Sequence, residues 1–302
     1  MSVERRKYIN KVMGVCGIMV LESLVDPTKA EHHPRKMVWY GFLYTTVAIF
    51  VGWWVFYTYA SMIFVFLAAI AAVPLMYNTI KYEEKKDLQL QPEKILIKEH
   101  GKALSFFMYL FIGMTLAGVV WYVVLPSEMT GALFESQMST INAINGGVTG
   151  LAFGEQMSAF TRIFLNNVKV MIFCALFSLL YGAGAIFILS WNASVISAAI
   201  GNSIRGNLAS YAHLAGFERL AQYLNVISVG LLKYVIHGVP EILAYFTAGL
   251  AGGIISIAII RHDFGTKKFE HIVLDSADLF LLSVGLLAVA AVLEVWVTPL
   301  IF

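Results

Sequence analysis

Long apolar runs, each bounded by charged or polar residues, dominate the chain. A helix needs about 20 mostly apolar residues to cross a bilayer. Five runs are consistent with this length: 38–59, 62–77, 104–125, 168–190 and 279–302. The second run is the shortest, so its helix is expected to be tilted or to extend beyond the run. The pattern predicts an all-α, polytopic transmembrane helix bundle.

A sixth run, 220–260, is too long for one crossing and barely long enough for two. Polar residues and a proline interrupt it near its middle: Lys233, His237, Gly238, Pro240 and Glu241. Proline removes a backbone hydrogen bond and breaks or kinks a helix. The run is therefore expected to form a broken or re-entrant helix pair that crosses twice.

The basic residues test this count, because Lys and Arg concentrate in cytoplasmic loops. They gather in the N-terminal arm, in the 81–102 loop, and at Arg205, Arg219, Arg261, Lys267 and Lys268. All of these fall on one side if 220–260 crosses twice. The sequence thus predicts about seven crossings in the cell membrane, with the N-terminus in the cytoplasm, segment 126–167 outside and the C-terminus outside.

Composition supports this class of protein and excludes others. Hydrophobic residues make up 59% of the chain, charged residues make up 13%, and the mean hydropathy is +0.75. A soluble domain carries about a quarter charged residues. A formal charge of +2 gives no basis for nucleic-acid binding. Cys16 and Cys174 lie in different surroundings, so we expect neither a disulfide nor a metal site, and we expect no cofactor.

Two amphipathic regions lie outside the spans, and membrane lipids are expected partners. For the outer loop, dimerisation or docking of a partner protein explains the pattern as well as membrane seating does. Residues 1–36 form a basic, amphipathic cytoplasmic arm suited to the headgroup layer, followed by an N-terminal hairpin and charged loop at 37–102. In the outer loop, Phe134, Met138, Ile141 and Ile144 repeat at helical spacing before Gly146–Gly147. Phe153, Met157, Phe160 and Phe164 do the same after it. The loop is expected to form two short interfacial helices hinged at the glycines.

Depth along the helices predicts a polar layer near the outer leaflet. At a rise of about 1.5 Å per residue, both the break in 220–260 and Glu294 lie roughly 25 Å from the inner ends of their spans. The candidate residues are Asn166, Asn167, Lys169, Lys233, His237, Glu241 and Glu294. A paired network that locks the bundle is one interpretation. A transporter-like ion or substrate site at the broken helix is another. A metal or catalytic site has weaker support, because His237 and Glu241 supply only two ligands.

A second polar cluster follows the fourth run and is expected to face the cytoplasm. Its members are Asn192, Asn202, Arg205 and His213. Glycines at 182, 184, 201 and 206 lie among them, and small residues let helices approach closely.

The second half of the chain resembles the stage II sporulation protein M family. The resemblance rests on Phe164, Asn167, Gly182, Trp191-Asn192 and Gly201, and on His237-Gly238 with Glu241, Ala244, Gly249 and Gly253. It covers about 103–302, which we treat as a family-like transmembrane core. The arm and hairpin before it look like the extended form found in archaeal members. The sporulation member works with partner proteins in remodelling the cell wall during engulfment.

These observations predict a multi-pass membrane protein without a soluble enzyme domain. The resemblance implies protein partners or a homo-oligomer. The favoured function is a scaffold or component of an envelope-associated membrane complex. The alternative is a channel or secondary transporter that uses the outer polar layer. We expect no enzymatic activity, because no nucleophile and base stand at a suggestive spacing.

Overall fold

The computed structural model describes residues 34–87, 93–145, 153–211, 213, 216–261 and 265–301, and these residues form helices and short connections without strands. The predicted amphipathic helix of the N-terminal arm and the Gly146–Gly147 hinge lie outside the described residues. Within the described part, seven helices are long and apolar enough to cross a membrane. The predicted all-α class and the predicted number of helices able to cross a membrane are therefore confirmed.

The first three spans form one packed unit. A short 3-10 turn, η1 (Pro34–Lys36), leads into α4 (Met37–Val55), and a second turn, η2 (Tyr57–Tyr59), leads into α5 (Ala60–Asp87). After the gap at 88–92, α6 (Glu93–Val124) follows. Gly41 and Gly113 let α4 and α6 meet closely, since a Cβ at either position would overlap backbone atoms of the other helix.

Two short helices cover the end of this unit. They are α7 (Ser127–Leu133) and α8 (Glu135–Asn145), and α8 includes the predicted apolar repeat from Met138 to Ile144. The second predicted interfacial helix was wrong. Its residues, 153–164, instead open the long helix α9 (Phe153–Tyr181), because the apolar spacing continues without interruption into the span.

The predicted span at 168–190 was also wrong, since a turn divides it. Helix α9 ends at Tyr181, and α10 (Ala185–Ser210) begins after Gly182, Ala183 and Gly184. Gly182 has φ +70°, a conformation that costs little only for glycine. The Ser178 hydroxyl accepts a hydrogen bond from the Ala185 backbone N–H at 3.2 Å, which satisfies one of the free donors at the start of α10.

The predicted helix pair at 220–260 was wrong as well. One helix, α11 (Gly216–Ile260), runs through the whole region with Pro240 inside it. A proline is tolerated within a transmembrane helix when neighbouring groups compensate for the lost hydrogen bond. The seventh span therefore arises at the turn Gly182–Gly184 and not at the proline, and α11 crosses once.

The chain ends in a helix of changing pitch. Helix α12 (Lys267–Val292) begins with Thr266 as its N-cap, whose hydroxyl accepts from the Phe269 backbone N–H at 3.2 Å. A π-helical stretch, η3 (Leu293–Val297), and the last helix, α13 (Thr298–Ile301), continue it.

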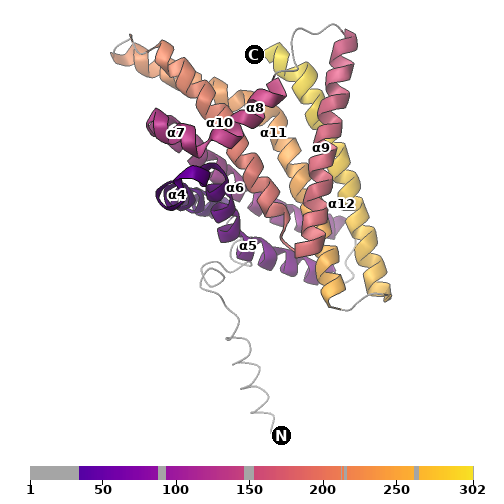
Figure 1. Cartoon of the computed structure of the whole chain (residues 1–302). Coiled ribbons are helices and arrows are strands. Elements are labelled where there is room, and N and C mark those ends of the chain that lie inside the picture. The colour runs from indigo at the N-terminus through magenta and orange to yellow at the C-terminus, as the bar shows by residue number, and fades with distance from the viewer. Residues whose placement is uncertain are drawn as a thin grey trace.

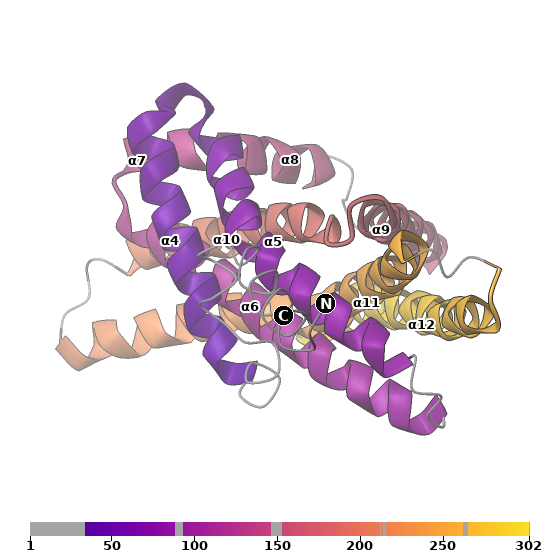
Figure 2. The same cartoon turned by 90° about the horizontal axis from the view of Figure 1, so that it is seen from below.

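The helices do not all run in parallel. In Figure 1, α9 and α12 run along the height of the molecule, whereas α4 is seen nearly end-on. Figure 2 shows α4, α5 and α6 lengthwise, whereas α9 and α12 are strongly foreshortened. The two groups therefore cross steeply. Helices α7 and α8, the start of α9 and the C-terminal end share the upper half of Figure 1.

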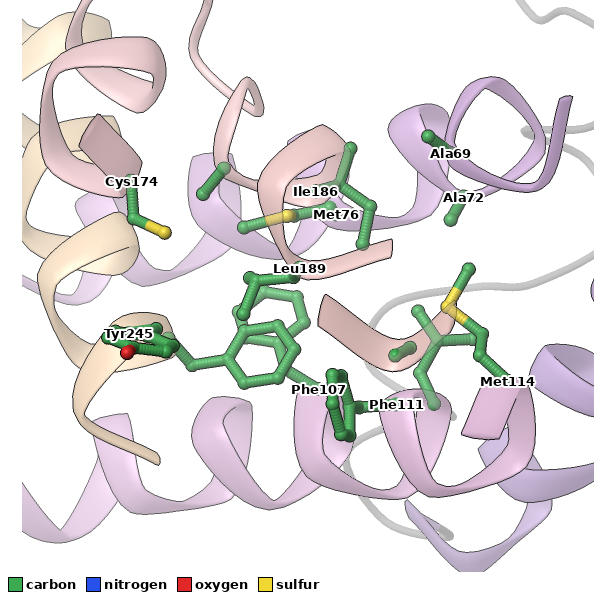
Figure 3. Close-up of a cluster of buried hydrophobic side chains, with 14 of the residues drawn as sticks. Ala69, Ala72, Met76, Phe107, Phe111, Met114, Cys174, Ile186, Leu189 and Tyr245 are labelled. Carbon is green, nitrogen blue, oxygen red and sulfur yellow. The ribbon is translucent and has the colours of Figure 1, made fainter. Parts of the chain in front are cut away.

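One apolar core joins the two groups. It includes buried residues from all seven spans. Figure 3 shows Phe107 and Phe111 of α6 at its centre, with Cys174 and Tyr245 on one side and Met114 on the other. The rings of Phe107 and Phe246 stack with centroids 5.4 Å apart, which fixes α11 against α6.

Candidate functional site

The predicted polar layer assembles where α9, α11 and η3 meet. Helix α11 carries His237 and Glu241, and η3 carries Glu294. The ring of Phe160 in α9 packs on Trp296 in η3 with centroids 5.5 Å apart, so α9 closes one side of the layer. Segments far apart in the sequence therefore meet near the two carboxylates.

Glu241 has a partner on its own helix. The Tyr245 hydroxyl donates a hydrogen bond of 2.8 Å to its Oε1, and Tyr245 is only 1% exposed. The spacing of four residues places the two side chains on the same face of α11. A carboxylate within a span is costly unless it is hydrogen-bonded. Tyr245 therefore stabilises Glu241 where it lies.

Glu294 supplies a second carboxylate to the same layer. It lies close enough to Glu241 for the two side chains to interact electrostatically. Both side chains are half-buried. Two neighbouring carboxylates repel each other when both are charged, so this pair is stable only with a proton, a cation or donor groups nearby.

The third member of the layer, His237, is contacted by the residue that follows the π-helix. Thr298 follows η3, and its hydroxyl donates to the Leu293 carbonyl at 2.9 Å. The same hydroxyl lies 3.4 Å from His237 Nδ1 on α11. The widened turn of η3 thus links the end of α12 to the centre of α11. π-Helical stretches of this kind are frequent at functional sites.

The remaining predicted members differ in their placement. Asn167 is buried on α9, but its neighbours Asn166 and Lys169 are exposed. Lys233 is exposed one turn before His237 and interacts with it electrostatically. The described layer therefore centres on His237, Glu241 and Glu294. Within the described residues, no group of three or more His, Cys, Asp or Glu side chains has the arrangement of a metal site.

The second predicted cluster does not stay together. Asn192 donates to the Ile188 carbonyl of its own helix, and His213 is exposed beyond the end of α10. Asn202 and Arg205 instead face the end of α6. The Tyr122 hydroxyl donates to Asn202 Oδ1 at 3.3 Å.

Arg205 closes the end of α6. Its Nη1 donates to the carbonyls of Tyr122 and Leu125 at 3.3 and 3.2 Å and to Thr130 Oγ1 at 3.1 Å. Its Nη2 donates to Ser127 Oγ at 2.9 Å. Cationic side chains favour helix C-termini, where carbonyl groups lack partners.

The predicted cytoplasmic position of this cluster was wrong, as the hydrogen bonds of Arg205 show. Asn202 and Arg205 lie at the same end as α7, a segment that the sequence placed on the opposite side of the membrane. The reason is the turn at Gly182–Gly184, which adds a crossing before α10.

An open cavity of about 590 Å³ with a mixed polar and apolar lining lies beside Arg205. Helices α6, α7, α8 and α10 line it and leave it widely open to the outside, and its lining residues are Tyr122, Ser127, Thr130, Gly131, Glu135, Met138, Ser139, Asn142, Asn202 and Arg205. We call it the Arg205 cavity. Sequence analysis identified only Asn202 and Arg205 among these residues, because the others belong to helices that meet only in the fold.

Sequence analysis also missed a buried hydrogen-bonded pair, His100 and Glu83. His100 Nδ1 lies 2.9 Å from Glu83 Oε2, and the two residues are 2% and 0% exposed. Glu83 ends the second span and His100 opens the third. The pattern had grouped both with the charged loop, whose residues are normally solvated. Their pairing fastens α5 to α6 at the end of the bundle that carries this loop.

Comparison with known protein families gives a match over most of the chain. The family model described as Stage II sporulation protein M matches residues 41–299. No curated protein and no solved structure matches the chain.

Proposed function

Because the chain belongs to the stage II sporulation protein M family, an integral membrane protein family, we propose that it serves as a membrane scaffold in an envelope-associated complex. The alternative is a channel or secondary transporter that uses the polar layer. The two functions require different environments for His237, Glu241 and Glu294. A scaffold needs them held in closed helix contacts, and a transporter needs them accessible to water.

The observation that carries the scaffold proposal is the bonding within the layer. Tyr245 holds Glu241, and Thr298 lies within hydrogen-bond distance of His237, so the polar groups connect neighbouring turns and helices. Helix α11 is continuous at this depth and offers no half-helix ends to a substrate. The Arg205 cavity includes none of the three residues in its lining. Such contacts favour a structural anchor.

One observation favours the transporter. Glu241 and Glu294 lie close enough to interact electrostatically, beside a π-helical stretch and within two spans. Ionisable groups at membrane depth frequently mark proton or ion pathways. The pair therefore justifies a direct test of flux.

Substitutions at Glu241 separate the two functions. Glu241→Leu removes the acceptor for the buried Tyr245 hydroxyl, and an unsatisfied buried donor costs about 1–3 kcal/mol. Glu241→Gln keeps an acceptor oxygen and should restore most of that stability. We expect the melting temperature in detergent to fall for Leu and to recover for Gln, with Glu218→Leu, an exposed site on the same helix, as the control.

Flux is measured on the same variants in proteoliposomes. The scaffold proposal predicts background flux of protons and monovalent cations for all of them. A flux through the unmodified protein that Glu241→Gln abolishes at unchanged melting temperature would establish the transporter instead.

A further inference from the structure

The Arg205 cavity combines opposite charges that do not neutralise each other. Arg205 contributes a guanidinium and Glu135 a carboxylate to one lining. The recorded partners of Arg205 are Tyr122, Leu125, Thr130 and Ser127, and Glu135 is not among them. The cavity therefore offers a cation and an anion at separate places on its wall.

Arg205 is held rigidly but keeps donors for a ligand. A guanidinium has five N–H donors. The Nη1 group serves three acceptors, whereas Nη2 donates to Ser127 Oγ alone among the described residues. One Nη2 hydrogen and the Nε hydrogen stay available. A guanidinium fixed by carbonyl groups loses little further entropy on binding an anion.

Neutral groups complete the lining. Asn202 Oδ1 accepts from Tyr122, and its amide group donates to no acceptor among the described residues, so both amide hydrogens are available to a ligand. Ser139 and Asn142 of α8 are exposed and line the same cavity. Its volume of about 590 Å³ falls within the range of small-molecule sites, about 300–1,000 Å³.

The cavity lies at the end of a candidate membrane span. It forms where the span 100–124 ends, and the short helices α7 and α8 bound it. The interior of a bilayer excludes charged groups, whereas its headgroup layer is rich in them. A ligand at this depth meets the cavity either as part of a lipid or from solution.

From this arrangement we propose that the Arg205 cavity binds a zwitterionic headgroup that carries a phosphate and a primary ammonium, the chemistry of phosphoethanolamine. The phosphate accepts from Arg205 and Asn202, and the ammonium donates to the Glu135 carboxylate. A ligand with only one charge leaves one of the two cavity groups without its counter-charge. A quaternary ammonium cannot donate a hydrogen bond to Glu135.

Binding is tested on the full chain, purified in an uncharged detergent and stripped of lipid. Native mass spectrometry measures binding of phosphatidylethanolamine, phosphatidylcholine and phosphatidylglycerol, and calorimetry measures binding of free phosphoethanolamine. We expect one phosphatidylethanolamine per chain, bound at least about tenfold more tightly than the other two lipids. Binding of free phosphoethanolamine with similar affinity identifies a soluble ligand, and much weaker binding identifies the lipid.

Glu135→Gln is the diagnostic variant, because Glu135 is exposed and its change should leave the fold intact. We expect this variant to lose the preference for phosphatidylethanolamine over phosphatidylcholine. Glu128→Gln, an exposed carboxylate on α7 that does not line the cavity, should keep it. Equal binding of all three lipids, or a preference that survives Glu135→Gln, would overturn the proposal.

Discussion

At the residue scale, glycines determine how closely the helices approach. Gly113 is buried on α6, and a Cβ there would overlap the Val38 carbonyl oxygen of α4. The neighbouring backbone cannot yield as a flexible side chain would. Packing of this kind is a main source of helix association inside a membrane, where burial of apolar surface adds little.

Gly113→Ala should therefore destabilise the protein by about 1–3 kcal/mol, the usual cost of overpacking. Gly285→Ala provides the matched control, since Gly285 is also helical but a Cβ there meets no atom within 4 Å. Melting temperatures in detergent are the measurement. Equal melting temperatures for the two variants would show that α4 and α6 are not in close contact.

At the scale of elements, the position of one turn decides the topology. The turn at Gly182–Gly184 places the C-terminal end of α10 on the same side as α7, and it leaves α11 as a single crossing. Positions 128 and 210 then share one side, and position 266 lies on the other.

Cysteine labelling in sealed vesicles tests this topology. In a background without Cys16 and Cys174, single cysteines at Glu128 and Ser210 should react with an impermeant thiol reagent from the same side. A cysteine at Thr266 should react only from the opposite side. If the cysteine at position 210 reacted from the same side as the one at position 266, the result would support the helix pair predicted from the sequence and contradict this topology.

Sequence analysis predicted the fold class and the number of candidate spans correctly, because the total length of the apolar runs is enough to determine both. It misplaced the division between two spans for a physical reason. Pro240 is a strong helix breaker in water, yet packing keeps it inside α11, while Gly182 adopts a positive φ that no apolar pattern reveals. The same error placed Arg205 on the wrong side. Tyr245, by contrast, lies four residues after Glu241, so helical spacing could have identified it.

At the scale of the whole molecule, polar groups in the spans act mainly as fasteners between helices. Gln137 of α8 donates to the Ser61 carbonyl at 2.9 Å and to Ser194 Oγ at 3.1 Å, joining α8 to α5 and α10. Glu83 and His100 do the same for α5 and α6. Together with the contact of His237 with Thr298, these bonds tie helices of the bundle to one another. Such contacts suit a protein that holds partners in place.

The most direct test of the proposed scaffold is the size of the assembly that the protein forms in its own membrane. The tagged chain, extracted with surrounding lipid in polymer-bounded native discs, is weighed by mass photometry and its components are identified by quantitative mass spectrometry. We predict an assembly larger than one 33.4 kDa chain, with partners or further copies at fixed stoichiometry. Recovery of a single chain without a stoichiometric partner would contradict the scaffold function.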